Sequence, residues 1–181
     1  MKFFTVMIGI GMLLVMGCAQ ADGSFYQLPD VQLQDQDGHQ FSLASLAGTP
    51  RLIGMFYSSC TDICPYEIEQ VDQFEKALQE DHHAVLPAIL ISMDPADGLA
   101  TLQQVAAKHH LSGTSLSLVR IIQGDLGMLE GVLGVHARSL GMHAFAHEPV
   151  LTLFDGDGHV RAQVQASVLN QPQVRARLLH E

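Results

Sequence analysis

Three long apolar runs, separated by amphipathic stretches, constrain the fold of this 181-residue chain more than any other feature. The runs cover residues 51–57, 85–93 and 116–122 and consist largely of aliphatic residues, which is typical of strands buried on both faces. Between the first two runs, apolar residues recur at helical spacing, namely Ile68, Val71, Phe74 and Leu78. This alternation predicts an α/β domain with helices on both faces of a mixed sheet.

Turn and helix signals supply the other predicted elements. Asp37 and Gly38 lie between two alternating runs, which predicts an N-terminal β-hairpin. Residues 155–158 (Asp-Gly-Asp-Gly) resemble the opening of a calcium loop but lack its Glu at position 12, so a hairpin turn is predicted. The full predicted order is a hairpin at 31–35 and 40–43, a strand at 51–57, a helix from Cys64 or Pro65, a strand at 85–93, a helix at 99–109, a strand at 116–122, a helix at 125–133, a hairpin at 150–154 and 160–164, and a helix at 171–179.

The composition excludes two classes of function. The chain has 9 Lys and Arg against 19 Asp and Glu, so its formal net charge is −10. A nucleic-acid-binding protein needs a surplus of Lys and Arg to neutralise phosphates, and a polybasic membrane patch needs the same surplus. Neither is expected here. With 48% hydrophobic residues, the chain is expected to form one domain with a substantial core.

The first 17 residues are predicted to be a lipoprotein-type signal peptide. Lys2 supplies a positive charge, and the uncharged stretch 3–16 is shorter than the ~20 residues that span a bilayer. The sequence Leu-Val-Met-Gly-Cys that ends at Cys18 resembles a bacterial lipobox, in which the cysteine is lipidated and becomes the first residue of the mature chain. An uncleaved anchor and an incidental cysteine are the open alternatives.

This interpretation divides the chain into a signal peptide at 1–17, a lipidated Cys18 with a short tether at 18–27, and a domain at 28–181. It places the domain on the periplasmic side of a bacterial membrane, attached by a lipid anchor, and leaves open which membrane holds the lipid. Only Cys60 and Cys64 then remain as thiols. In an oxidising compartment such a pair becomes an ordinary disulfide unless it has another use.

Cys60 and Cys64 lie between the end of the first long strand and the start of the first helix, which is the layout of the thioredoxin fold. At i,i+4 spacing their β-carbons would be about 5–6 Å apart, and the helix N-terminus stabilises a thiolate. The pair therefore suits a soft metal ion, thiol–disulfide exchange or a structural disulfide, and spacing alone does not separate these uses. Glu67 and Glu69 follow, where their charges are expected to favour the helix dipole.

The residues around this pair resemble the signature of the Sco/SenC family. Residues 56–65 read Phe-Tyr-Ser-Ser-Cys-Thr-Asp-Ile-Cys-Pro, and the family pattern is an aromatic strand end followed by Cys-Pro-Asp-x-Cys-Pro, so Thr61 replaces the first proline. The family's Asp-Pro after its second strand is matched within residues 92–95 (Ser-Met-Asp-Pro). Its histidine before a strand and a Gly turn is matched by His147, which lies 83 residues after Cys64.

This resemblance covers about residues 25–180 and implies a thioredoxin-like domain that binds copper, as Cu(I) or Cu(II), through Cys60, Cys64 and His147. It implies a carrier rather than an enzyme, one that helps to load the copper centre of cytochrome c oxidase. The implied partner is the copper-bearing subunit of that oxidase or another periplasmic cuproprotein. The chemistry agrees, because soft thiolates select Cu(I) and imidazole also accepts Cu(II).

A thiol–disulfide oxidoreductase is the alternative function. Cys60 would attack a partner disulfide and Cys64 would resolve the mixed disulfide, which makes the pair catalytic and leaves His147 dispensable. In thioredoxins a cis proline begins the strand beside the cysteines, so a cis bond before Pro149 is predicted. A thiol peroxidase is disfavoured, because peroxidases of this fold favour a Thr three residues before the attacking Cys, where this chain has Tyr57.

Other polar residues have competing interpretations. His143 and His136 are alternatives to His147 as the third ligand. Asp62 either tunes the thiols or caps the helix, and Asp94 lies either at the edge of the site or simply in a turn before a proline. The methionines at apolar positions are interpreted as core residues rather than copper ligands.

Overall fold

The computed structural model describes residues 23–80, 86–141 and 143–180. The predicted signal peptide, the lipidation of Cys18 and residues 18–22 of the predicted tether therefore lie outside the described residues and stay predictions. The rest of the predicted tether includes the 3-10 helix Phe25–Gln27, and Phe25 and Tyr26 are buried in the core of the domain. Within the described part of the chain, no helix is both long enough and apolar enough to span a bilayer.

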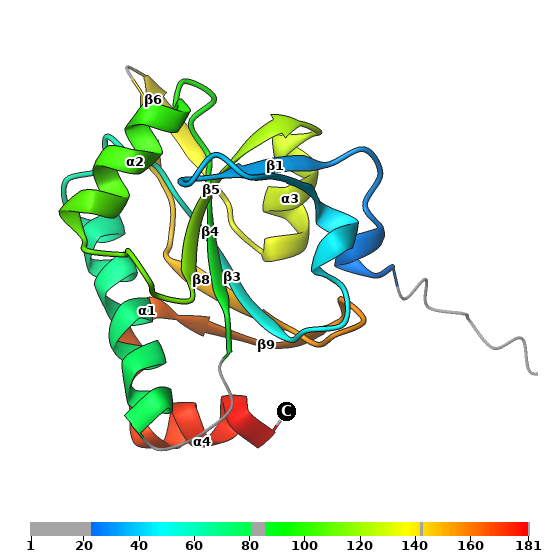
Figure 1. The fold of residues 1–181 in the computed structure, drawn as a ribbon, viewed down its shortest axis with the longest axis vertical. Helices are drawn as coiled ribbons and strands as arrows, with labels where there is room; N and C mark the ends of the chain where they lie inside the picture. Colours follow the sequence, from blue (N-terminus) through cyan, green and yellow to red (C-terminus); the bar gives the residue numbers. More distant parts are fainter. Residues whose placement is uncertain (1–22, 81–85, 142, 181) are drawn as a thin grey trace, which may run out of the picture.

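A seven-stranded mixed sheet forms the centre of the domain, in the order β2-β1-β5-β4-β3-β8-β9 (Figure 1). The strands β3, β4 and β5 pair in parallel, and β1 and β8 flank them in antiparallel pairing. The strands of this sheet are β1 (Gln32–Asp35), β2 (Gln40–Ser42), β3 (Arg51–Phe56), β4 (Ala88–Ser92), β5 (Leu116–Gln123), β8 (Val150–Phe154) and β9 (Val160–Gln165). A separate two-stranded hairpin consists of β6 (Arg138–Gly141) and β7 (Ala144–Ala146).

Helices cover both faces of the sheet. The α-helices are α1 (Ile63–Glu80), α2 (Leu99–Lys108), α3 (Leu126–Leu133) and α4 (Pro172–His180), and short 3-10 helices occupy Phe25–Gln27, Leu43–Leu46 and Ala166–Val168. The Glu67 side chain of α1 lies against Gly54 of β3. On the opposite face the Thr152 hydroxyl of β8 donates a hydrogen bond of 3.1 Å to Leu133 O of α3. Figure 1 accordingly shows α1 and α3 on opposite sides of the sheet.

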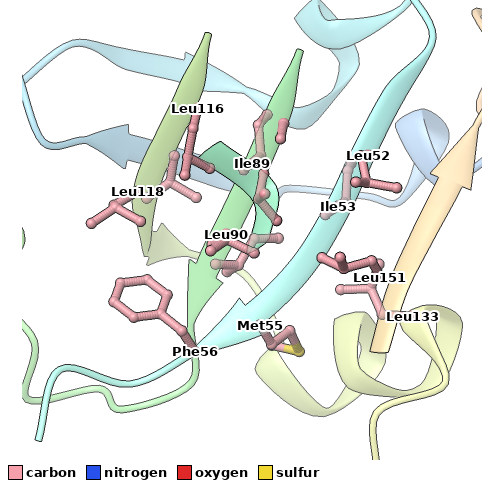
Figure 2. Close-up of a cluster of buried hydrophobic side chains, with 14 of the residues drawn as sticks. Leu52, Ile53, Met55, Phe56, Ile89, Leu90, Leu116, Leu118, Leu133 and Leu151 are labelled. Carbon is pink, nitrogen blue, oxygen red and sulfur yellow. The ribbon is translucent and has the colours of Figure 1, made fainter. Parts of the chain in front are cut away.

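The core follows from these two covered faces. Every residue of β4 is buried, and β3 is buried from Leu52 onward, as the apolar runs predict. The side chains of β3, β4 and β5 pack side by side across the sheet (Figure 2). Helix α1 contributes the four predicted residues Ile68, Val71, Phe74 and Leu78, all of which are buried.

The fold predicted from sequence is confirmed, and so is each predicted helix and strand, with boundaries that shift by a few residues. Both predicted hairpin turns form. In each turn one carboxylate, that of Asp35 or of Asp155, accepts hydrogen bonds from two backbone N–H groups. Gly38 and Gly158 have a positive φ in these turns. The sequence did not predict the β6–β7 hairpin, because its two strands are short and largely exposed and lack an apolar run.

The predicted cis bond before Pro149 is wrong. The described residues contain no cis peptide bond, so the Glu148–Pro149 bond is trans. The likeness to thioredoxin therefore extends to the sheet and the cysteine loop but not to this peptide bond. A trans bond is also the ordinary state of X-Pro bonds in folded proteins.

We expect Glu75 to make the domain less stable as the pH rises. This side chain of α1 is 3% exposed, and its Oε2 accepts a hydrogen bond of 3.2 Å from Ser115 N. Burial raises the pKa of Glu75 from 4.5 to about 7, so the folded state holds a proton that the unfolded chain has lost. The stabilising contribution is therefore complete below pH 4.5 and is lost as the pH rises through 7.

The variant Glu75→Gln cannot lose that proton. Its unfolding free energy should fall less between pH 4.5 and pH 8 than that of the natural chain, by on the order of 2 kcal/mol. Urea denaturation at both pH values measures this difference. Glu69→Gln, on the exposed face of the same helix, is the matched control. Parallel pH dependences of the natural chain and Glu75→Gln would contradict the assignment.

Candidate functional site

The thiol pair lies between the end of β3 and the first turn of α1. Residues 57–59 form a turn after β3, in which Cys60 N donates to Tyr57 O at 3.3 Å, and α1 then begins at Ile63. Cys60 therefore precedes the helix and Cys64 lies in its first turn, as predicted. The Cys60 sulfur accepts a hydrogen bond of 3.2 Å from Cys64 N. The sulfur thus satisfies one of the free N–H groups that every helix start exposes.

The two thiols differ in exposure and in pKa. Both are free, with Cys60 9% exposed and Cys64 1% exposed. Burial disfavours the Cys60 thiolate, but hydrogen bonds from the Cys64 thiol and from the backbone outweigh it, so the pKa of Cys60 is lowered. Burial, and next the hydrogen bond given to Cys60, raise the pKa of Cys64 strongly. Cys60 is therefore the accessible thiolate of the pair and Cys64 is its protonated neighbour.

A buried carboxylate holds the loop that carries Cys60. Asp97 is 5% exposed and accepts hydrogen bonds from Ser58 N at 3.0 Å, from Ser92 Oγ at 2.5 Å and from Ser58 Oγ. Ser92 ends β4, so this network ties the cysteine loop to the neighbouring parallel strand. Asp97 was not predicted from the sequence as part of the site, although it lies only three residues after Asp94 in the same turn.

His147 reaches the thiol pair from the segment between β7 and β8. Its Nε2 lies 3.7 Å from Cys64 Sγ, and its Nδ1 lies 3.2 Å from Glu148 O. Its ring packs edge-on against Tyr57, with 5.9 Å between ring centroids. Burial lowers the pKa of His147, which favours the neutral ring. With Nδ1–H donating to the Glu148 carbonyl, the lone pair of Nε2 faces Cys64.

The other two histidine candidates have different neighbours from His147. His143 lies on the β6–β7 hairpin, and its Nδ1 contacts Asp94 Oδ2 at 2.9 Å. Asp94 therefore contacts the hairpin in addition to its place in a turn before a proline. His136 is exposed and lines, with His147, a hollow of about 460 Å³. Asp62 is also exposed, and its backbone N–H helps to lower the pKa of Cys60.

Glu67 contradicts the expectation that it favours the helix dipole as a charge. It is 0% exposed, and neither carboxyl oxygen has a hydrogen-bond partner among the described residues. Burial, and next the charge of Cys60, raise its pKa well above the usual 4.5, which favours the neutral acid. The side chain fits because Gly54 faces it, where a β-carbon would lie 2.9 Å from Glu67 Oε1.

A cleft of about 340 Å³ opens onto the thiol pair from the side of α2. Its walls include Cys60 and Cys64 on one side and Gln104, Val105 and Lys108 of α2 on the other. His147 does not line this cleft among the described residues. A second molecule could therefore approach the sulfurs without passing the imidazole.

The three predicted ligands lie near one another but do not form a closed cluster. Among the described residues, the groups of three such side chains whose ligand atoms all lie within 4.8 Å of one another are in the two hairpin turns, at residues 35–39 and 155–159. Cys60, Cys64 and His147 are not one of these groups. The structure thus brings the imidazole of His147 to Cys64, while the ligand atoms of the three residues are not all within 4.8 Å of one another.

Comparison with known proteins identifies the family. The profile of the SCO1/SenC family matches residues 23–180, which is nearly the whole of the described chain. The chain belongs to the SCO1/SenC family. Members of this family act in the copper assembly of cytochrome c oxidase.

Individual relatives agree with this assignment. A protein of Stutzerimonas stutzeri named a putative copper-binding protein is 26% identical over 145 residues, which are 77% of this chain and 69% of the relative. Mitochondrial Sco1 of Saccharomyces cerevisiae is 31% identical over 81 residues, which are 44% of this chain but only 28% of the yeast protein.

A solved structure, ScoI of Bradyrhizobium japonicum with copper bound, is 25% identical and superposes with a TM-score of 0.66 over 82% of this chain and 95% of the ScoI chain. The thioredoxin-like fold of the domain is therefore shared with its relatives.

The asymmetry of the thiols predicts selective alkylation. In the reduced protein near pH 7.5, iodoacetamide should modify Cys60 at least about tenfold faster than Cys64, because Cys60 is the more accessible thiol and has the lower pKa. Mass spectrometry of timed samples gives both rates. The variant Cys60→Ser shows how slowly Cys64 reacts alone. Equal rates at the two cysteines in the natural chain would contradict the structure.

Proposed function

We propose that this protein is a copper carrier whose metal ligands are Cys60, Cys64 and His147. The single observation that carries the proposal is the 3.7 Å contact between Cys64 Sγ and His147 Nε2. It joins residues that are 83 positions apart and pairs a sulfur with the free lone pair of a neutral imidazole. The copper named for the Stutzerimonas relative, and present in the Bradyrhizobium structure, supports the choice of metal.

The donor set suits a metal that must be passed on. Two thiolates and one imidazole are soft to borderline ligands, which favour Cu(I) and also accept Cu(II). Copper would displace the Cys64 proton, so affinity should fall as the pH falls. The three ligands leave room for a ligand of the recipient to join before one of them leaves, in contrast to a closed four-ligand site.

We also propose, from the sequence, where the protein lies in the cell and which protein receives its copper. The signal peptide at 1–17 would export the chain, and the lipid on Cys18 would hold the domain at the periplasmic face of a bacterial membrane. The recipient would be the copper-bearing subunit of cytochrome c oxidase or another periplasmic cuproprotein. The family's part in oxidase assembly supports this proposal.

Copper titration of the reduced, detergent-solubilised full chain tests the ligand set. The natural chain should bind one equivalent of Cu(I) in competition with a chromogenic chelator. Cys64→Ala should abolish tight binding, because it removes a thiolate. His147→Ala should weaken binding by more than about 100-fold, beyond the 10–100-fold that loss of an outer partner typically costs. His136→Ala, which removes an exposed histidine from the same hollow, is the matched control. Unchanged affinity in His147→Ala would overturn the ligand set.

Thiol–disulfide exchange remains a second candidate, favoured by the cleft that opens onto Cys60 and by the lowered pKa of that thiol. The Cys60 thiolate would attack a partner disulfide and release one partner thiolate, and Cys64, after losing its proton, would displace the other. The partner leaves as a dithiol, and the pair is left as a disulfide that an external thiol must reduce.

Turnover of an insulin-type disulfide substrate with dithiothreitol as the reductant separates the two functions. An oxidoreductase should retain its turnover in His147→Ala and lose it in Cys60→Ser. A carrier should show negligible turnover in the natural chain, although it binds copper tightly. High turnover without tight copper binding would replace the carrier proposal by the oxidoreductase.

A further inference from the structure

The β6–β7 hairpin, which leads directly into His147, is not part of the main sheet. Within the described residues its two strands pair with each other and with no strand of the seven-stranded sheet. All four residues of β6 are exposed, and Leu140 is 59% exposed. Phe145 of β7 packs half-buried against the core, with its ring edge-on to Tyr57 and 5.2 Å between ring centroids. Because β6 is exposed, the position of the hairpin also depends on specific polar contacts.

Three polar contacts join the hairpin to the end of the sheet that carries the thiols. Tyr57 Oη donates to Phe145 O at 3.1 Å, and Ser59 Oγ donates to His143 O at 2.6 Å. Both of these hydrogen bonds use carbonyl groups of the hairpin. The third contact, from His143 Nδ1 to Asp94 Oδ2 at 2.9 Å, uses a hairpin side chain. The identity of a hairpin residue therefore decides whether this third contact exists.

Asp94 is a rigid partner for His143. Its side chain is 5% exposed and its Oδ1 accepts a hydrogen bond of 2.9 Å from Ala96 N. Its own N–H donates to Ser92 Oγ at 3.2 Å, at the end of β4. The carboxylate is thus fixed to the central sheet. The His143 side chain is 62% exposed, so only one side of this contact is mobile, and the contact loses less to side-chain disorder than one between two exposed side chains.

His143 also holds an unusual backbone conformation. Its φ is +61°, in the left-handed region that few residues other than Gly, Asn and Asp adopt readily. Only three residues, those of β7, lie between His143 and His147. An extended segment of this length spans about 10–13 Å and transmits the position of one end to the other. Anchoring His143 therefore restricts where the imidazole of His147 can lie.

We propose that the Asp94–His143 pair is a positioning device that holds the β6–β7 hairpin against the cysteine loop and so sets the place of His147 beside the thiols. The expected effect on copper affinity rests on the proposed copper-binding function, whereas the attachment of the hairpin by this pair does not. The thiols are placed by β3 and α1, so loss of the pair should affect the imidazole ligand and leave the sulfur ligands in place.

Amide hydrogen exchange of the metal-free chain tests the geometry. His143→Asn removes the imidazole and keeps a residue that tolerates a positive φ, and Asp94→Asn removes the charge while keeping an acceptor for Ala96 N. Each variant should raise exchange in residues 138–146 and leave exchange in α1 unchanged. His39→Asn is the matched control, because it removes a His–Asp contact of 3.0 Å from the remote β1–β2 turn. Unchanged exchange in the hairpin in both variants would overturn the proposal.

Copper binding tests the consequence. His143→Asn should lower Cu(I) affinity by about 10–100-fold, as loss of a partner that orients a ligand does. In the Cu(II) form it should weaken the nitrogen coupling seen by electron paramagnetic resonance. In a His147→Ala background the same substitution should have no further effect, because the ligand it positions is absent. A full additional loss in that background would show that the pair acts through general stability and would overturn the proposal.

The two proposals fail in different ways. If the natural chain binds copper with an affinity that does not depend on His147, the proposed ligand set is wrong, and the exchange experiment alone decides whether the pair holds the hairpin. If the affinity depends on His147 but not on His143 or Asp94, the copper site stands and the positioning device is wrong.

Discussion

The parallel pairing of β3 with β4 is the constraint on which the site depends. Its register sets Phe56 opposite Ser92, and Met93 N extends the ladder by donating to Phe56 O at 2.8 Å. Because the strands are parallel, both chains leave the sheet at the same edge. The loop with the cysteines and the turn with Asp94 and Asp97 therefore meet there. The polar contacts of Asp97 with the thiol loop, and those of Asp94, Tyr57 and Ser59 with the β6–β7 hairpin, start from this edge.

Burial at this edge keeps the site low in charge. Two sulfurs, a carboxyl and an imidazole lie in a largely apolar environment, where an unpaired ion costs several kcal/mol. Burial raises the pKa of Glu67 and of Cys64 and lowers the pKa of His147, and each of these shifts favours the neutral form. Of the two thiols, Cys60 has the lowered pKa, because hydrogen bonds favour its thiolate. In the proposed copper site, Cu(I) would therefore meet one favoured thiolate and would displace the proton of Cys64.

Much of this arrangement could be predicted from the sequence, because burial on both faces of a parallel sheet requires apolar runs. The position of the thiol pair followed from its place between the first such run and an amphipathic helix. Glu67 and Glu75 could also have been recognised as buried, since they fall on the same helical stripe as Ile68, Val71 and Phe74. Glu67 was instead expected to favour the helix dipole as a charge, because carboxylates are rarely buried.

The remainder depends on contacts that no local pattern encodes. The place of His147 came only from the family resemblance, because 83 residues separate it from Cys64 and no spacing rule links them. The β6–β7 hairpin could not be predicted, because its two short strands are largely exposed and their sequence shows no regular alternation of apolar and polar residues. Its contacts with Asp94, Tyr57 and Ser59 join residues far apart in the chain, and such polar pairs cannot be predicted from a single sequence.

The proposed copper ligands stand on two different supports. The sulfur ligands belong to the loop after β3 and to α1, which the core fixes. The imidazole follows the β6–β7 hairpin, which is attached by three polar contacts, each worth about 1 kcal/mol, and by the packing of Phe145 on Tyr57. Displacing the hairpin should therefore cost less than disturbing the thiols. A recipient that competes for the metal would meet the weakest resistance at His147, so the imidazole should leave first while the two thiolates still hold the copper.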